Sequence, residues 1–167
     1  MFGSKIVVAL ATMGLLLVTT PAIAAESGSG LGWSVTFLSR SYDSATDRTT
    51  FSYRVSSGSD GSKVKALSHF VVGLPSCESK LEVLATAPSE AVEIGTDPTT
   101  GVYGVKWDLS LEPGQSRDYS LTIAGNHAVS EAKVAVKAGK PTATISLSGI
   151  SCASGDDDTP GDDTPGD

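Results

Sequence analysis

Few residues in this sequence of 167 are placed to act as nucleophile, acid or base. Its two histidines are His69, among apolar residues, and His127, in the turn-like stretch AGNHAV. We expect His69 to be a packing or surface residue and His127 to be solvated. Strand-like alternation places the neighbouring acids Asp108, Glu112 and Asp118 toward solvent. Serine is abundant, but the Gly-x-Ser-x-Gly motif of an exposed nucleophile is absent. The sequence therefore predicts a protein that is not an enzyme.

Aspartates in three loop-like stretches are candidate ligands for a hard cation. Asp43 and Asp47 share SYDSATD, Asp60 lies in SGSDG, and Asp97 lies in GTDPTTG. Carboxylate oxygens gathered at one end of a sandwich would bind Ca²⁺. Aspartate is also a common turn residue, because its side chain accepts local backbone hydrogen bonds. Since the Asp-x-Asp-x-Asp-Gly calcium loop is absent, the pattern favours turns. Ca²⁺ binding is a secondary hypothesis, and no other cofactor is expected.

Aromatic rings in an exposed row would indicate carbohydrate binding, because such rings offer broad flat surfaces for stacking. The candidates are Tyr42, Tyr103, Trp33 and Trp107. Only Tyr42 falls in a loop-like stretch, whereas alternation assigns the other three rings to core-facing positions. Carbohydrate binding is therefore the alternative function, with Tyr42 as its candidate binding residue.

Residues 1–24 have the features of a secretory signal peptide. Lys5 precedes an apolar run of 13 residues over 6–18, and small residues surround Ala24. The run is shorter than the ~20 residues that span a bilayer. We expect cleavage after Ala24, with Ala25 as the next candidate, and no transmembrane anchor in the mature chain. The sequence thus predicts a secreted, extracellular or cell-surface protein.

The two cysteines, Cys77 and Cys152, each follow a strand-like segment. An even number of cysteines in an exported chain indicates a disulfide. The alternative is two free or metal-bound thiols, but two cysteines without a nearby histidine pair make a poor metal site. We therefore expect a Cys77–Cys152 bridge, which would stop the last strand from fraying.

The acidic residues are concentrated at the C-terminus. Six of the 19 lie within 156–167, where no Lys or Arg occurs. The rest of the expected mature chain has 13 acidic residues against 11 basic ones, once Lys5 leaves with the signal peptide. A nucleic-acid partner would require a basic stripe, so none is expected. Residues 154–167 repeat Gly-Asp-Asp-Thr-Pro and are predicted to form a disordered tail.

Between a leader at 25–30, predicted to be flexible, and this tail, the chain alternates between apolar and polar residues. Period-2 alternation is typical of half-buried strands. Residues 65–75 are instead apolar on both faces in their middle, as in a central strand, and Pro75 ends them. With this segment the expected strands number nine: 33–37, 50–55, 65–75, 80–87, 91–95, 102–111, 117–125, 132–139 and 142–149. The pattern predicts an all-β fold, an antiparallel sandwich of about nine short strands over 31–153. A closed barrel is the alternative.

The stretch WDLSLEPGQSRDYSLTI resembles the recurring core of Ig-like modules in prokaryotic surface proteins, and is similar to the cell-adhesion-related domain found in bacteria. Those modules join two strands by a Leu-x-Pro-Gly-x-Ser turn. The matching residues are Leu111, Pro113, Gly114, Ser116 and 121–123. RTTFSYRVSSGSD also resembles a strand of that family. The resemblance implies an Ig-like sandwich and a non-catalytic interaction module, adhesive or structural, with an extracellular protein or polysaccharide as partner.

Overall fold

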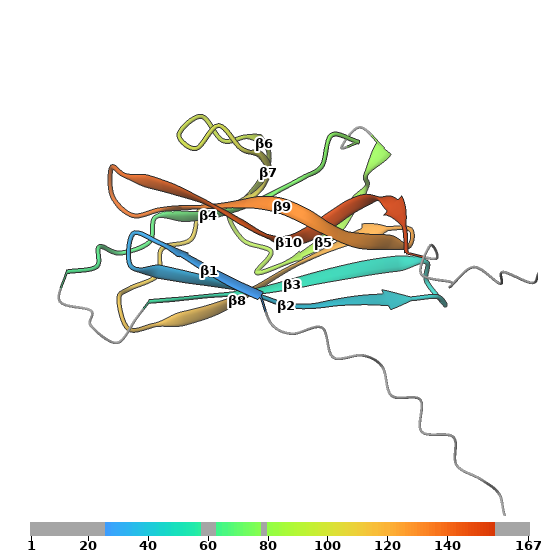
Figure 1. The fold of residues 1–167 in the computed structure, drawn as a ribbon, viewed down its shortest axis with the longest axis horizontal. Helices are drawn as coiled ribbons and strands as arrows, with labels where there is room; N and C mark the ends of the chain where they lie inside the picture. The colour runs from blue at the N-terminus through green and yellow to red at the C-terminus, as the bar shows by residue number, and fades with distance from the viewer. Residues whose placement is uncertain (1–25, 58–62, 78–79, 156–167) are drawn as a thin grey trace, which may run out of the picture.

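The described chain is a sandwich of two antiparallel β-sheets with five strands each (Figure 1). The computed structural model describes residues 26–57, 63–77 and 80–155. The predicted all-β class is confirmed, with ten strands instead of about nine. No helix within these ranges is long and apolar enough to cross a membrane. The predicted signal peptide, Asp60 and tail residues 156–167 lie outside the described residues.

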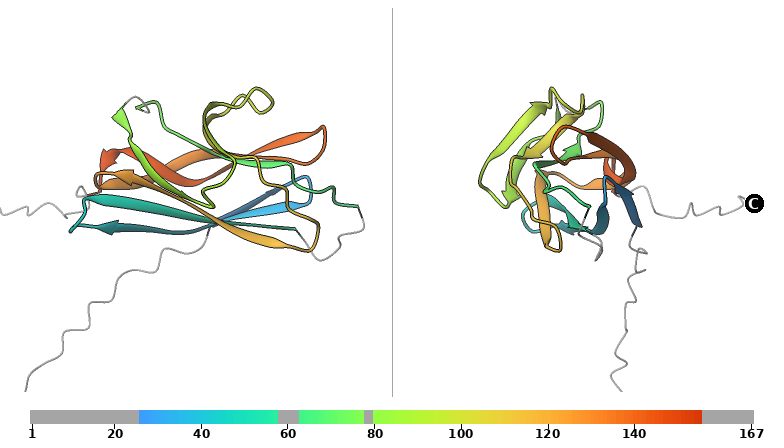
Figure 2. Two further views of the ribbon diagram at one scale, coloured as in Figure 1. Left: turned by 180° about the vertical axis from the view of Figure 1, so that it is seen from behind. Right: turned by 90° about the vertical axis from the view of Figure 1, so that its left-hand side faces the viewer.

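The strand order is β1-β2-β3-β8-β5 in the first sheet and β10-β9-β4-β7-β6 in the second. In chain order the strands are β1 (Glu26–Gly30), β2 (Trp33–Asp43), β3 (Arg48–Ser57), β4 (His69–Gly73), β5 (Val83–Ala87), β6 (Val92–Thr96), β7 (Tyr103–Trp107), β8 (Ser116–Ala124), β9 (His127–Lys137) and β10 (Thr142–Ser154). The view along the sandwich in Figure 2 shows the two sheets wrapped around one interior.

The core forms because alternation buries one face of each long strand. Trp33 and Val35 of β2 are fully buried, while Ser34 between them is partly exposed. Between the sheets, the ring of Phe70 lies 5.9 Å from that of Trp107 and 4.9 Å from that of Tyr119, centroid to centroid. These contacts join both sheets through aromatic packing. The result is a firm scaffold for the outer faces.

The Glu-Pro-Gly-Gln-Ser join at 112–116 carries the chain from β7 in the second sheet to β8 in the first. Gly114 has a φ of 86°, a conformation that other residues adopt only with strain. The backbone N–H of Gln115 donates to the carbonyl of Glu112 at 3.1 Å. The predicted Pro-Gly turn is therefore present, and β8 keeps its inward-facing register.

Residues 26–30, predicted as a flexible leader, form the edge strand β1, paired with β2. That prediction was wrong because the Ser/Gly sequence carries no apolar alternation, whereas backbone pairing needs none. Because its glycines have no side chain, β1 can also approach β10 closely. A Cβ atom on Gly28 would lie 2.3 Å from Cγ2 of Ile145, and the carboxylate of Glu26 accepts a hydrogen bond from the N–H of Ser148 at 3.1 Å. One side of the sandwich is thereby closed.

Candidate functional site

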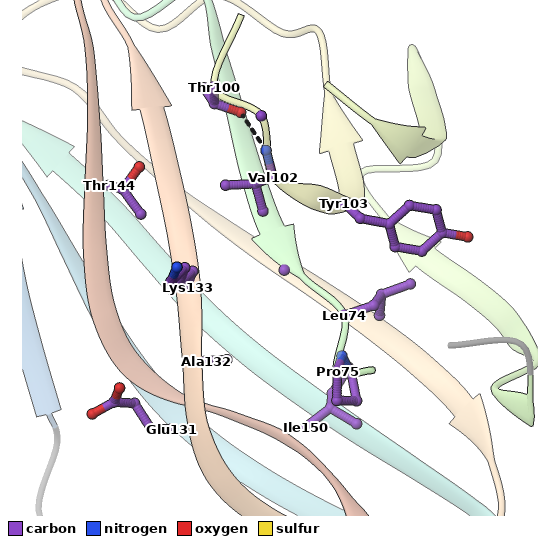
Figure 3. A pocket seen from close by; sticks show the side chains of 12 residues that line it. Leu74, Pro75, Thr100, Val102, Tyr103, Glu131, Ala132, Lys133, Thr144 and Ile150 are labelled. Atoms are coloured by element: carbon purple, nitrogen blue, oxygen red, sulfur yellow. Dashed lines mark hydrogen bonds between the residues drawn. The ribbon is translucent and has the colours of Figure 1, made fainter. Parts of the chain in front are cut away.

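A cavity of about 440 Å³ lies at the end of β4 in the second sheet (Figure 3). Phe70 of β4 and Val134 of β9 belong to the core, so neighbouring residues such as Lys133 face away from it. Two segments border the cavity: the chain after β4, and the loop between β6 and β7, which stands above this sheet in Figure 1. Its lining comprises Gly73, Leu74, Pro75, Thr100, Gly101, Val102, Tyr103, Glu131, Ala132, Lys133, Thr144 and Ile150.

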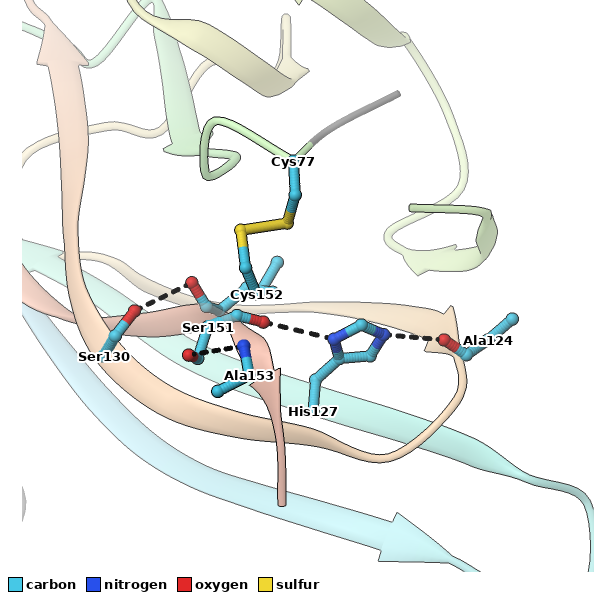
Figure 4. Close-up of a disulfide and its surroundings, with 8 residues drawn as sticks. Cys77, Ala124, His127, Ser130, Ser151, Cys152 and Ala153 are labelled. Atoms are coloured by element: carbon cyan, nitrogen blue, oxygen red, sulfur yellow. Dashed lines mark hydrogen bonds between the residues drawn. A yellow bond between two sulfur atoms is a disulfide. The ribbon is translucent and has the colours of Figure 1, made fainter. Parts of the chain in front are cut away.

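The first wall is fixed by the disulfide between Cys77 and Cys152, which confirms the predicted bridge (Figure 4). The two Cα atoms are 5.9 Å apart. Cys77 closely follows the wall residues Leu74 and Pro75, and Cys152 closely follows the lining residue Ile150. The bridge therefore ties the segment after β4 to strand β10 beside the cavity.

The second wall is fixed by Asp97, whose side chain is buried in the loop between β6 and β7. Its Oδ2 accepts hydrogen bonds from Oγ1 of Thr99 at 2.9 Å, and from the backbone N–H and Oγ1 of Thr100 at 2.9 and 2.6 Å. Burial alone would raise the pKa of Asp97, but the hydrogen bonds from Thr100 and Thr99 hold it well below its usual range. Asp97 thus sets the position of Thr100 at the cavity. The signal in the sequence was Asp-x-Thr-Thr, which is typical of side-chain-capped turns.

His69 anchors this loop to strand β4. Its side chain is only 6% exposed, and its Nε2 lies 3.2 Å from Oδ2 of Asp97 and 3.4 Å from Oγ1 of Thr99. On the other side of the ring, Nδ1 lies 3.5 Å from Oδ1 of Asp108. His69 is therefore buried, but it makes polar contacts with the carboxylates of Asp97 and Asp108. The hydroxyl of Thr99 also donates to Asp97. We call the contacts among His69, Asp97 and Thr99 the clamp, because they hold the loop between β6 and β7 against strand β4.

Asp108 is exposed, as predicted, and it also contacts two basic side chains. Its carboxylate contacts both the imidazole and Lys106, whose Nζ lies 2.9 Å from Oδ2 of Asp108 and 2.6 Å from Oε2 of Glu93. Hydrogen bonds to Asp108 and Glu93 raise the pKa of Lys106 to about 12. Glu112 and Asp118 are exposed, as predicted. The clamp therefore extends across β7 to the edge strand β6.

Of the candidate Ca²⁺ ligands in the described residues, Asp43 and Asp47 share one hairpin and Asp97 lies apart from them. Asp43 accepts hydrogen bonds from the N–H of Ala45 at 3.0 Å and from Oγ1 of Thr46 at 2.7 Å, and the bond from Thr46 lowers its pKa. Asp47 accepts the hydroxyl of Tyr42, in the same β2–β3 hairpin. Asp97 lies in the loop between β6 and β7, two strands of the other sheet. Within the described ranges, no three His, Cys, Asp or Glu side chains are grouped to hold a metal ion.

Tyr103, which alternation assigned to the core, is exposed, so Tyr42 is not the sole aromatic candidate among the described residues. Trp33 and Trp107 are fully buried, but Tyr103 is 40% exposed at the rim of the cavity. Alternation placed its side chain on the correct face of β7, the face of Val105 and Trp107. Tyr103 is nevertheless exposed because it is the first residue of β7, beside the loop, where the opposite sheet no longer covers that face. Tyr42 lies within β2 instead of a loop, where its hydroxyl donates to Asp47 at 2.9 Å.

His127 lies near the disulfide and is partly buried, not solvated as expected (Figure 4). Its Nδ1 is 3.1 Å from the carbonyl oxygen of Ser151, and its Nε2 is 2.9 Å from that of Ala124. The imidazole therefore joins the end of β8 to the end of β10. This contact supports the same strand that carries Cys152.

Taken together, the cavity has two walls held in place by independent means, one covalent and one polar. Its lining combines apolar, hydroxyl and charged side chains, which suits reversible binding of a ligand. The sequence matches no protein-family model, and no curated protein matches it.

Proposed function

We propose that the protein is a non-catalytic, exported interaction module of Ig-like type, acting at the cell surface or in the extracellular space. The observation that carries the proposal is a cavity whose walls are positioned by the Cys77–Cys152 disulfide and by the buried Asp97. Disulfides persist in oxidising compartments, which favours export. Binding sites commonly lie on loops held by a rigid scaffold, and this cavity has that construction.

The experiment is to compare the protein in the medium with the protein washed from the surface of the producing cells. We expect an intact mass for residues 25–167 less two hydrogens, and retention of purified protein on the cells. An uncleaved N-terminus with both thiols reduced would contradict export. Failure to bind any cell-envelope material would contradict the interaction role.

Carbohydrate binding is the second candidate function, and it is favoured by Tyr103. Tyr103 is 40% exposed, at the start of β7 on the face that carries Val105 and Trp107. An exposed aromatic ring offers a flat surface on which a sugar can pack. An adhesive module with a protein partner would remain in solution when mixed with insoluble polysaccharide. A carbohydrate-binding module would be depleted from solution by the same material.

A further inference from the structure

Strand β6 is the least protected of the sheet edges in the described chain. Strands β1 and β10 lie against each other, as the hydrogen bond from Ser148 to Glu26 shows. Strand β5 carries a register shift between Val83 and Ala85, and such a bulge interferes with the addition of another strand. Strand β6 pairs with β7 along its whole length without a shift, and no other described strand pairs with its outer edge. That edge is therefore open to a further strand.

The register of β6 shows which of its backbone groups point to the open edge. Asp97 is the residue after β6, and its N–H donates toward β7, to the carbonyl of Val102 at 2.9 Å. Because backbone groups point to alternate sides along an antiparallel strand, Gly95 and Glu93 also face β7. The N–H and C=O groups that face away from β7 are therefore those of Val92, Ile94 and Thr96. A further strand would bond to these groups.

Ile94 adds an apolar side chain to this edge. It lies opposite Val105 of β7 and shares its core-facing side of the sheet. It is nevertheless 53% exposed, the highest fraction among the large apolar side chains of the described residues. A hollow of about 430 Å³ borders residues 93–97 and Lys106, and the hairpin of β6 and β7 projects from the sandwich in Figures 1 and 2. A further strand with an apolar residue beside Ile94 would extend the core beyond β6.

We infer that β6 pairs with β6 of a second copy of this chain, antiparallel and centred on Ile94, to form a symmetric dimer. The two Ile94 side chains would lie opposite each other on the core-facing side, and Val92 of each copy would lie opposite Thr96 of the other. On the outer side Glu93 would lie opposite Gly95, where a Cβ atom would meet no other atom within 4 Å. Each residue with outward backbone groups would then exchange both of its hydrogen bonds with the residue opposite.

Charge favours this register and a second copy as the occupant. A pairing centred on Glu93 would place two carboxylates directly opposite, which destabilises a sheet. In the register centred on Ile94 each Glu93 faces a glycine instead, and its charge is offset by Lys106 of its own chain, whose Nζ lies 2.6 Å from the carboxylate. The strand is therefore complementary to its own copy, as a two-fold interface requires. This pairing uses a surface other than the cavity and goes beyond the proposed function.

The first test is sedimentation velocity of the oxidised, exported protein from micromolar to millimolar concentration. We expect a reversible equilibrium between monomer and dimer. Ile94→Lys should weaken dimerisation about tenfold or more, because two ammonium groups would meet at the two-fold axis. Leu84→Lys is the matched control, since Leu84 is an exposed apolar residue of the edge strand β5, and it should leave dimerisation unchanged. A wild type that stays monomeric, or equal weakening by both variants, would overturn the inference.

Amide hydrogen exchange tests which strand pairs in the dimer. As the protein concentration rises, the N–H groups of Val92, Ile94 and Thr96 should become protected, because they gain hydrogen bonds only in the dimer. The N–H groups of Glu93 and Gly95 face β7 and should change little. Protection that depends on concentration elsewhere in the chain, with none on β6, would refute the assignment of the interface.

The variant Ile94→Cys tests the register. Residues that form a hydrogen-bonded antiparallel pair have Cα atoms ~5.5 Å apart, within the range that a disulfide bridges. Both native cysteines are already paired with each other, so mild oxidation should link two copies of this variant. Leu84→Cys should be linked far more slowly, and equal rates for the two variants would contradict a dimer centred on Ile94.

The dimer and the proposed function fail separately. A monomer whose β6 amides are protected only by an unrelated extended peptide would show that the edge takes a different chain, and the second copy would be the wrong occupant. A monomer that still binds cell envelopes would overturn the dimer and leave the proposed function intact. A dimer through β6 that binds no envelope material would support this inference and contradict the proposed function.

Discussion

Asp97 shows how one side chain organises a wall of the cavity. Its carboxylate collects the hydroxyls of Thr99 and Thr100 and the N–H of Thr100, and it faces the imidazole of His69. A buried polar group of this kind is stabilising only while its partners are complete, since an unmatched buried donor loses its solvation. Asp97 should therefore be sensitive even to conservative change.

We expect Asp97→Asn to lower the free energy of unfolding by about 2 kcal/mol, because hydrogen bonds to an uncharged amide oxygen are weaker than those to a carboxylate oxygen. Urea denaturation at pH 7 measures the change. Asp118→Asn is the matched control: its carboxylate is 55% exposed and pairs with Arg54, so the loss should stay below about 1 kcal/mol. Equal losses in both variants would contradict the role given to Asp97.

The free energy of unfolding should depend on the carboxylate of Asp97 at acid pH as well. The pKa of Asp97 is lowered in the folded protein, so the unfolded chain binds its proton more readily, near its ordinary value of about 3.9. The stabilisation by Asp97 is therefore complete above that value and is lost as the pH falls toward the folded pKa. The difference in urea midpoint between wild type and Asp97→Asn should shrink below about pH 4. A difference in urea midpoint that stays constant from pH 7 to pH 3 would show that the charge of Asp97 does not stabilise the fold.

At the scale of elements, local alternation predicted most strands because period-2 burial is written into neighbouring residues. Strand β1 was missed, since its Ser/Gly sequence pairs through the backbone alone and packs by lacking side chains. The exposure of Tyr103 was missed because alternation gives a face, but not where the opposite sheet ends. The His69–Asp97 contact joins residues 28 apart, a pairing that neither local pattern contains.

Strand β1 offers a direct test of close packing between the two sheet edges. Gly28→Val should destabilise the protein by about 1–3 kcal/mol, because its side chain would collide with Ile145 of β10. Ser27→Val is the matched control, since Ser27 is exposed on the same strand. Chemical denaturation compares them, and a neutral Gly28→Val would show that β1 does not pack on β10.

At the scale of the whole molecule, the disulfide joins residues 75 apart in sequence. The double variant Cys77→Ser with Cys152→Ser should lower the free energy of unfolding by about 4 kcal/mol, from the entropy that the unfolded chain regains. Wild type in excess dithiothreitol should show the same loss, which separates the bond from the effect of serine. A double variant as stable as the oxidised wild type would contradict this.

The same bond decides how the molecule carries a mechanical load. Tension applied to the chain beyond Ser154 reaches Cys152 almost at once and passes through the sulfur atoms to Cys77, beside β4. The part of β10 before Cys152 therefore carries little of the tension, and its hydrogen bonds to β9 do not break one after another. In force spectroscopy with one handle at the C-terminus, reduction should add a new extension step as β10 detaches. The oxidised protein should resist as a single block, which is the property that a tethered domain under shear requires.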